Sequence, residues 1–259
     1  METKDIKMTP KWSKSKDEIW KDVFADLEDE ATPQAKRISF WRYAAAAVIV
    51  VAILGSAFAG LYTVTSTASR GMHLTVTLPD GSVAELNAES ELRYKPCWWV
   101  ISRKVELKGE AYFKVVPGSK FTVGSGQNEV NVLGTSFNVL ARSQTYVVTC
   151  LTGKVEVRAA REKMILTPDM QFSLRNSKAV VTTLLHAPES ISWTDNRFSF
   201  MGVPLHEVVN EVERQYDIHI TTTSKLDYLY TGNFSKAKMP EEVLEIIGKP
   251  FGITFKIEP

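Results

Sequence analysis

The most pronounced feature of the sequence is a run that is apolar on every face. From Tyr43 to Val64, 22 consecutive residues carry no charge and nothing more polar than serine or threonine. As a helix this run would be about 33 Å long, which is enough to cross the hydrocarbon core of a bilayer. A buried helix of a soluble protein rarely stays apolar on all faces over such a length. The pattern therefore predicts a transmembrane helix over residues 43–64.

A cleaved signal peptide is the main alternative to this anchor. Residues 57–59, Ala-Phe-Ala, have the small-x-small form of a cleavage site. However, 42 residues precede the apolar run, and the run continues past this point. The charged segment of a signal peptide is much shorter, so we predict an uncleaved anchor.

The basic residues near the two ends of the run predict its orientation. Lys36, Arg37 and Arg42 lie before the run, whereas no Lys or Arg follows it before Arg70. Because the cytoplasmic flank carries the excess of basic residues, residues 1–42 should lie in the cytoplasm. The prediction is a single-pass protein of the cytoplasmic membrane whose larger, C-terminal part lies outside the cytoplasm.

The first 42 residues contain one short amphipathic segment. Ser15 and Glu18 have the spacing of a capping box, which marks the start of a helix. Apolar side chains then recur at helical intervals on one face, at Ile19, Trp20, Val23, Phe24 and Leu27. A single short helix is marginal in water and needs a surface to cover its apolar face. Its acidic residues disfavour an anionic membrane, so we predict a protein partner, with an unpartnered tail as the alternative.

Residues 72–184 consist of short alternating segments separated by turn residues, such as HLTVTL, PDG and SVAELN. Alternation of apolar and polar residues is typical of half-buried strands. No helical pattern of about 10–15 residues interrupts this stretch, which excludes a doubly wound α/β enzyme. We predict an all-β domain, either a sandwich or a rolled sheet, joined to the apolar run by a linker at 65–71.

The pattern changes again after a second linker, predicted at 185–196. Residues 197–259 follow the order β-α-β-β-α-β, with one helix opened by Pro204 and a second near Pro240. This order is that of a split βαβ unit, which is a small α+β module. We predict a separate C-terminal domain of this kind, and its fold alone does not assign a function.

Composition and charge exclude several classes of function. The 259 residues include 31 basic and 30 acidic side chains, so the chain lacks the basic surplus that a nucleic-acid surface needs. Two cysteines and four scattered histidines match no metal-ligand spacing, and no nucleophile motif is evident. We therefore predict no metal, no cofactor and no enzymatic activity. Glu106 and Glu110 are interpreted as a solvated strand face rather than a catalytic pair.

Two residue pairs leave alternatives open. Cys97 and Cys150 could form a disulfide outside the cytoplasm, or Cys150 could be a small buried residue in its apolar strand. Trp98 and Trp99 could form an exposed recognition patch. Because neighbouring strand residues face opposite sides, at least one of the two tryptophans should belong to the core.

Four blocks in the β-rich part carry a family resemblance. They are LPDGSVAELNAESELRY, RKVELKGEAYFKV, VLGTSFNV and LTGKVEV, which begin at Leu78, Arg103, Val132 and Leu151. In order and spacing they resemble the FecR-like anti-sigma regulators. The block FSFMGVPLHEVVNEVERQYDI, from Phe198, resembles the C-terminal domain of the Bacteroidetes-type members. That domain is similar to the short N-terminal domain of secretins and TonB-dependent transducers.

The resemblance implies a regulator in the cytoplasmic membrane of a Gram-negative bacterium. Residues 1–42 would bind an extracytoplasmic-function sigma factor, and the apolar face of the predicted helix is the expected contact. In the periplasm, Phe198–Pro259 would dock the signalling domain of an outer-membrane TonB-dependent transducer. Because a single helix can hardly transmit a conformational change, we predict that stepwise cleavage releases the sigma factor, with an intramembrane protease as a further partner; oligomer rearrangement is the alternative. The alternative function is a membrane-anchored periplasmic binding or scaffold protein with no role in transcription.

The dipeptide Gly134-Thr135 has chemical interest. In a strained turn, the Thr135 hydroxyl could attack the preceding carbonyl, and hydrolysis of the resulting ester would cut the chain. Such self-cleavage at Gly-Thr is known among some FecR-like proteins. The alternative, which we favour, is a glycine that supplies a turn between two strands.

Overall fold

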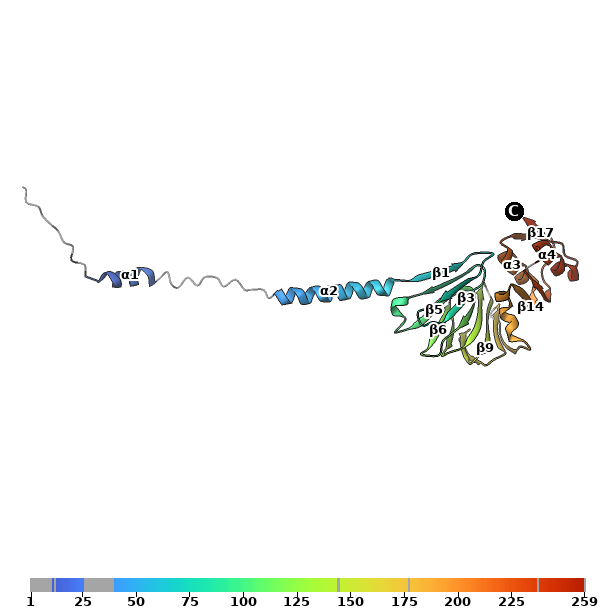
Figure 1. Cartoon of the computed structure of the whole chain (residues 1–259), viewed down its shortest axis with the longest axis horizontal. Helices are drawn as coiled ribbons and strands as arrows, with labels where there is room; N and C mark the ends of the chain where they lie inside the picture. The colour runs from blue at the N-terminus through green and yellow to red at the C-terminus, as the bar shows by residue number, and fades with distance from the viewer. Residues whose placement is uncertain are drawn as a thin grey trace, which may run out of the picture. The chain divides into compact units, whose positions relative to one another are not determined.

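A computed structural model describes residues 11, 13–25, 40–143, 145–176, 178–236 and 238–258 (Figure 1). The chain divides into two units, Met1–Leu54 and Gly55–Pro259. Helix α1 (Lys16–Ala25) belongs to the first unit, and helix α2 (Phe40–Leu61) begins in the first and ends in the second. The second unit contains a β-rich domain and a C-terminal module, each with its own hydrophobic core.

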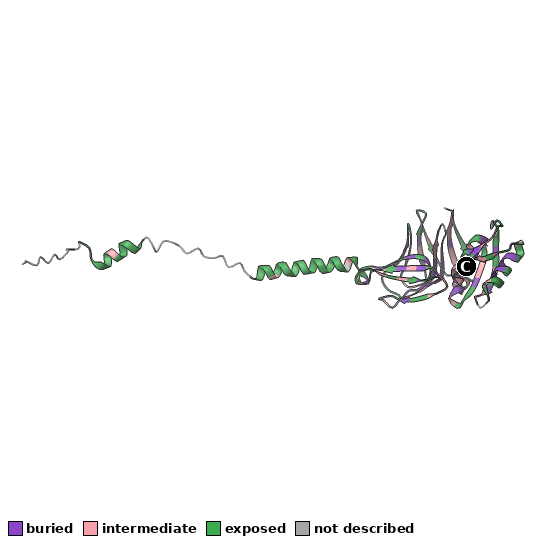
Figure 2. Cartoon of the chain, turned by 90° about the horizontal axis from the view of Figure 1, so that it is seen from above, coloured by how far each residue is buried: buried purple, intermediate pink, exposed green. Residues whose placement is uncertain are grey.

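The apolar run forms helix α2. Within the described ranges it is the one helix long and apolar enough to cross a membrane, with Phe40–Phe58 as the candidate span. Its described side chains are exposed along almost the whole length (Figure 2). The helix ends at Leu61 rather than at the predicted Val64, because Val64 already begins strand β1 (Val64–Ala68).

In its described residues the β-rich domain has thirteen strands, which form two sheet halves that share strand β5 (Arg103–Lys114). The first half has the strand order β1-β4-β5-β6-β7-β10-β11. Besides β1 and β5, its strands are β4 (Ser90–Tyr94), β6 (Phe121–Ser125), β7 (Asn128–Val132), β10 (Val155–Ala159) and β11 (Glu162–Leu166). The second half has the strand order β2-β3-β5-β8-β9-β12-β13. Besides β5, its strands are β2 (Leu74–Thr77), β3 (Val83–Leu86), β8 (Ser136–Arg142), β9 (Thr145–Thr152), β12 (Met170–Arg175) and β13 (Lys178–Thr183).

Strand β5 changes partners at its middle. Its first half pairs with β4 and β6, and its second half pairs with β3 and β8. Gly109 lies between the halves with φ of +99°, and a Cβ there would lie 2.7 Å from the Ser90 Cα. Only glycine fits both this approach and this backbone conformation. The large, fully buried side chains of the enclosed core include Phe113, Phe121, Phe137 and Phe172. The predicted all-β domain is therefore confirmed.

Both predicted linkers are part of the folded structure. Within 65–71, residues of β1 pair antiparallel with β4. Within 185–196, Ala187–Asp195 form the 3₁₀ helix η2, whose Trp193 is buried. Strand β1 lies at a sheet edge and carries alternating half-exposed polar residues, so it lacks the apolar alternation that marks a strand in the sequence.

The C-terminal module has the predicted order of elements. These are β14 (Arg197–Pro204), α3 (Leu205–Tyr216), β15 (His219–Thr221), β16 (Leu229–Ser235), α4 (Pro240–Gly248) and β17 (Lys256–Glu258). The strands pair as two separate ribbons, β14 with β16 and β15 with β17. The single sheet of a split βαβ unit is therefore not confirmed. Strands β15 and β17 are three residues long, too short for a sequence pattern to specify their register.

A buried ion pair fixes the turn that follows β2. The Arg103 guanidinium donates to the Asp80 carboxylate and to the Val116 carbonyl, and Ser82 donates to Asp80 through its backbone and its hydroxyl. Burial alone would raise the pKa of Asp80, but the hydrogen bonds from Ser82 and then Arg103 lower it below its ordinary 3.8. The ionised carboxylate therefore stabilises the fold.

We expect Asp80→Asn to reduce the free energy of unfolding at neutral pH by about 1–3 kcal/mol. Because the folded-state pKa of Asp80 is depressed, its contribution is complete above the ordinary value of 3.8 and is lost as the pH falls through the lower folded value. The difference in the free energy of unfolding between the native chain and Asp80→Asn should therefore shrink in this acid range. Denaturant unfolding of the detergent-solubilised chain at stepped pH measures it.

Asp195→Asn is the matched control for this prediction. Asp195 pairs with Arg197, and both side chains are about two-thirds exposed, at 67% and 65%. Exposed pairs contribute little, so this variant should unfold like the native chain at every pH. Equal effects of the two substitutions would contradict the role assigned to Asp80.

Candidate functional site

The short helix α1 begins with the predicted capping box. The Ser15 backbone N–H donates to Glu18 Oε2 at 2.9 Å, and the Glu18 backbone N–H donates to Ser15 Oγ at 3.3 Å. These reciprocal bonds satisfy two backbone donors at the helix start, where no intrahelical partner exists. Local sequence chemistry therefore accounts for the position at which α1 begins.

The predicted apolar face of α1 is present and uncovered. The Trp20 and Phe24 rings stack with centroids 4.5 Å apart, and Val23 lies between them in the sequence. These three side chains are 53%, 40% and 59% exposed, in the order Trp20, Phe24 and Val23. Ile19 is half-buried, and Leu27 lies outside the described residues. The structure thus brings four of the five predicted residues onto one helix with nothing packed over its aromatic pair in the described part of the chain.

A second site lies where the C-terminal module meets the β-rich domain. Asn87, which follows β3, donates through Nδ2 to Glu110 Oε2 of β5 at 2.8 Å and to Glu211 Oε1 of α3 at 3.1 Å. Gln215 of α3 donates to Asn87 Oδ1 and to Glu211 Oε1. Asn138 of β8 donates to the other Glu110 oxygen at 2.8 Å. Three of these five residues come from different strands or loops and the other two from α3, so only the tertiary fold brings them together. We call them the interdomain network.

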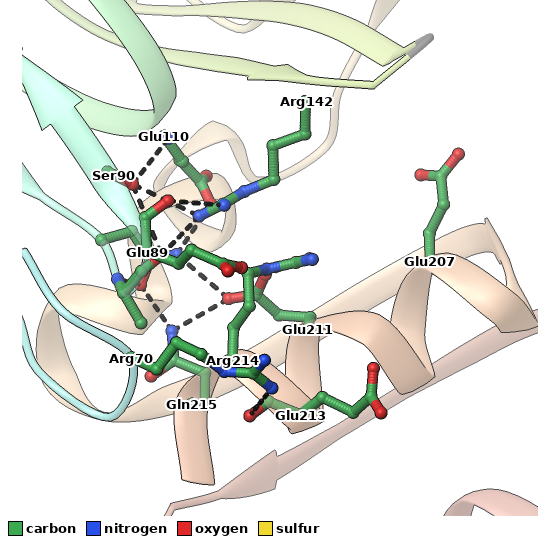
Figure 3. A network of polar contacts seen from close by, with 12 residues as sticks. Arg70, Glu89, Ser90, Glu110, Arg142, Glu207, Glu211, Glu213, Arg214 and Gln215 are labelled. Atoms are coloured by element: carbon green, nitrogen blue, oxygen red, sulfur yellow. Dashed lines mark hydrogen bonds and ion pairs between the residues drawn. The ribbon is translucent and has the colours of Figure 1, made fainter. Parts of the chain in front are cut away.

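Arginines surround the interdomain network (Figure 3). Arg214 donates to Glu211 Oε2 at 2.8 Å, and Arg142 donates to the backbone carbonyls of residues 88 and 89. Arg70 donates to the carbonyls of Glu213 and Ile218, at the C-terminal end of α3. A cation at this end of a helix meets carbonyls that lack intrahelical partners. The Arg70 contacts hold α3 against the β-rich domain, whereas the Arg214 bond lies within α3 and the Arg142 bonds lie within the β-rich domain.

The two buried carboxyl groups of the network have different protonation behaviour. Burial, and then the charge of Glu211, raise the pKa of Glu110 above its ordinary 4.5. Burial also opposes ionisation of Glu211, but the Arg214 and Arg142 guanidinium groups lower its pKa below the ordinary value. Glu211 is therefore the ionised partner of the arginines, and Glu110 is the carboxyl group that takes up a proton more readily.

The interpretation of Glu106 and Glu110 as one solvated face is wrong for Glu110. The Glu106 side chain is 50% exposed, whereas Glu110 is buried. The residues lie close to the bend at Gly109 on its two sides, and Asn87 links Glu110 to Glu211 of α3. The sequence does contain one signal of this interface. Glu211 and Gln215 are spaced i, i+4 beside the apolar stripe of α3, where two polar residues at core-facing positions indicate a buried polar contact.

Among the described residues, no group of three or more His, Cys, Asp and Glu side chains is placed to hold a metal ion. His73 lies beside the network, with Nε2 3.1 Å from Gln215 Oε1, and its ring packs edge-on against Trp193. Burial lowers the pKa of His73, so this histidine is neutral at pH 7. Its surroundings explain it as a packed, hydrogen-bonded side chain.

The structure decides between the two alternatives for Cys97 and Cys150, because no disulfide joins them. Cys97 is exposed and Cys150 is buried, and both thiols are free. Burial raises the pKa of Cys150 to about 11, so it remains a neutral thiol in its strand. The alternative interpretation of Cys150 as a small buried residue is therefore the correct one.

Gly134 lies in a tight contact. A Cβ at this position would lie 2.7 Å from the Pro117 Cα, so the backbone approach itself requires glycine. The hydroxyl of Thr135 is buried, and within the described structure it has no hydrogen-bond partner. The contact with Pro117 explains why residue 134 is a glycine. The Thr135 hydroxyl, which no hydrogen bond holds within the described structure, is the nucleophile that the cleavage hypothesis needs.

Because packing accounts for Gly134, we expect the purified full chain to run as one band on a denaturing gel, and Thr135→Ala to run identically. If the native chain instead ran as two fragments and the Thr135→Ala chain ran as one band, the Thr135 hydroxyl would be established as the nucleophile of self-cleavage. Thr122→Ala is the control, since Thr122 is also buried but donates to Asn131 Oδ1 at 2.9 Å.

Comparison with known proteins adds the family. A family model described as FecR protein matches residues 63–156, and one described as FecR, C-terminal, matches residues 197–259. Two crystal structures of a candidate anti-sigma factor from Parabacteroides distasonis ATCC 8503 are similar to the chain at 32% sequence identity, with TM-scores of 0.72 and 0.71. Each match covers 76% of this chain and 95% of the other. The chain belongs to the FecR family.

The FecR assignment supports an anti-sigma regulator, as the sequence blocks predict. It also implies a sigma factor as partner and a regulatory rather than catalytic role. Together with the apolar helix near the N-terminus, the FecR family suggests membrane anchoring. No curated protein sequence matches significantly.

Proposed function

We propose that this FecR-family protein spans the cytoplasmic membrane once, binds an extracytoplasmic-function sigma factor through α1, and releases it when its outer part meets a loaded TonB-dependent transducer. The observation that carries the proposal is the uncovered aromatic pair of α1 in a chain with both FecR-family domains. An amphipathic helix that presents anchors at i and i+4 suits a hydrophobic groove on a partner.

Several further features support the outer half of the proposal. The C-terminal module leaves large apolar side chains uncovered in the described structure, at Met201, Leu229 and Met239, which are 62%, 67% and 64% exposed. Exposed side chains of this kind are what a docking surface for the transducer needs. The interdomain network joins this module to the β-rich domain, and Arg70, two residues after β1, donates to carbonyls at the end of α3, so a displacement of the module also acts on the strand that follows α2. Cleavage of the helix by an intramembrane protease would then release the cytoplasmic part.

Capture from the native host tests the sigma-factor contact. Full-length tagged chain, solubilised from host membranes, should retain one small sigma factor. Recovery of outer-membrane and periplasmic proteins alone, with the full-length chain intact, would favour the membrane-anchored periplasmic scaffold.

Thiol labelling tests the orientation. In a Cys97→Ser background, a thiol introduced by Gln127→Cys should react with a membrane-impermeant maleimide on intact spheroplasts, because residue 127 is an exposed turn of the outer domain. A thiol introduced by Ser13→Cys, before α1, should react only after detergent is added. The remaining Cys150 is buried and serves as the internal blank. The reverse pattern would contradict a cytoplasmic N-terminus.

A further inference from the structure

The turn between β4 and β5 contains two adjacent tryptophans, of which one is buried and the other is exposed. Trp99 is buried, and its ring packs edge-on against Tyr94 and Phe121, with centroids 5.7 and 5.9 Å away. Trp98 is 41% exposed. The prediction that at least one tryptophan belongs to the core is confirmed, although the two lie in a 3₁₀ turn, η1 (Pro96–Trp98), and its C-cap rather than in a strand.

The same turn exposes two further apolar side chains. Val100 is 100% exposed and Ile101 is 75% exposed. The backbone of the turn is closed by hydrogen bonds, because the N–H groups of Ile101 and Ser102 both donate to the Trp98 carbonyl, at 2.9 and 2.8 Å. Trp99 anchors the turn in the core while the tip points apolar groups into solvent. We call Trp98, Val100 and Ile101 the apolar tip.

The turn that carries the apolar tip lies beside the end of helix α2. Lys95 Nζ donates to the Gly60 carbonyl at 2.8 Å, and a Cβ on Gly60 would lie 3.5 Å from Trp98 Nε1. Only Tyr62 and Thr63 separate α2 from β1. This connection can span at most about 10 Å, so the sheet begins close to the end of the helix. The turn is therefore fixed close to the point where the candidate membrane span ends.

We propose that the apolar tip inserts into the lipid headgroup layer around the outer end of α2, and so seats the β-rich domain directly on the bilayer. This inference rests on the proposed membrane anchoring. Lipid is the occupant that the geometry favours, because Trp98 lies beside Gly60 at the end of α2, and the side chains of Phe58 and Leu61 in this last part of the helix are 70% and 81% exposed. Tryptophan is also enriched at the level of the headgroups, where one end of its ring is apolar and the other is wet.

A second membrane contact changes what the outer domain can do. A domain tethered by one helix alone can swivel about the short connection at residues 62–63. A domain held by both α2 and the apolar tip has a fixed inclination to the membrane, so the C-terminal module faces a constant direction. A displacement of the C-terminal module then acts on a β-rich domain that is held against the membrane, rather than on one that can swivel.

The native Cys97 thiol lies within the turn and offers a direct test. The full-length chain is labelled at Cys97 with an environment-sensitive fluorophore, since Cys150 is buried, and is reconstituted into vesicles of phosphatidylethanolamine and phosphatidylglycerol. Nitroxide-bearing lipids with the spin label near the headgroup should quench this fluorophore strongly. The double substitution Val100→Asp, Ile101→Asp should abolish most of the quenching, and both positions are exposed enough to leave the fold intact.

The matched control is a fluorophore on Gln127→Cys in the Cys97→Ser background. Residue 127 lies in the turn after β6, at the opposite end of that strand from Phe121, which packs on Trp99. This label should remain unquenched. Chain that fails to float with the vesicles would overturn the anchoring itself. Chain that floats with an unquenched Cys97 label, or with both labels quenched alike, would overturn the apolar tip as a lipid contact and leave the anchoring in place. A tip that binds a protein partner instead gives the unquenched result in pure lipid.

Discussion

Replacement of Glu211 by alanine is expected to lower the free energy of unfolding by about 3–5 kcal/mol, because it removes one partner from a buried ion pair. Glu211 accepts hydrogen bonds from Asn87, Gln215 and Arg214, and its charge compensates the buried Arg142. Without it, arginine charge is left uncompensated between α3 and the β-rich domain. We therefore expect the C-terminal module to undock before the β-rich domain unfolds, which makes the η2 segment accessible to protease. Limited proteolysis and thermal unfolding of the solubilised chain measure both effects.

Glu207→Ala provides the control on the same helix. Glu207 also bridges α3 to the β-rich domain, through Arg175 and Thr145, but its pair with Arg175 is partly exposed, at 22% and 34%. Its loss should cost at most about 1 kcal/mol. Glu211→Gln, which keeps the shape and removes the charge, should fall between the two. If Glu211→Ala and Glu207→Ala were equally mild, the interdomain network would not be what holds the module in place.

The double substitution Trp20→Asp, Phe24→Asp should weaken sigma-factor binding by roughly 100-fold or more, since buried aromatic anchors of an interface often contribute about 2 kcal/mol or more each. The stacked rings form the largest apolar surface of α1, and two carboxylates in their place would have to be desolvated in the partner's groove. Both positions are exposed in the chain itself, so the outer domains should be unaffected. The yield of sigma factor captured with equal amounts of full-length chain measures the loss.

Lys21→Asp is the charge-matched control for this pair. It changes the net charge by the same two units on the same helix, but it replaces a polar residue outside the apolar face. Binding should be retained within a few-fold. If Lys21→Asp abolished capture as fully as the double substitution, charge rather than the apolar face would carry the contact.

Features encoded in short stretches of sequence could be predicted before the structure. The capping box at Ser15 and Glu18, the aromatic face of α1 and the apolar helix α2 all follow from spacing within a few turns. The alternating pattern likewise predicts the all-β domain, because alternation reports one buried face of each strand. The order of elements in the C-terminal module follows from its change of period.

Features that depend on distant residues were not predictable in this way. The burial of Glu110 depends on the bend at Gly109 and on α3, which comes much later in the sequence. Strand β1 was missed because its polar edge lacks an apolar alternation, and only its pairing with β4 makes it a strand. The pairing of β15 with β17 involves three residues on each side, too few for a sequence pattern to specify.

Transcript abundance in the native host tests the central claim most directly. Three strains would carry the native chain, the Trp20→Asp, Phe24→Asp chain or the Lys21→Asp chain in place of the chromosomal copy. The account predicts that transcripts from the promoters of one sigma factor rise in the double variant alone. Unchanged transcripts in that strain, with the variant present in the membrane at the native level, would contradict an anti-sigma role for α1.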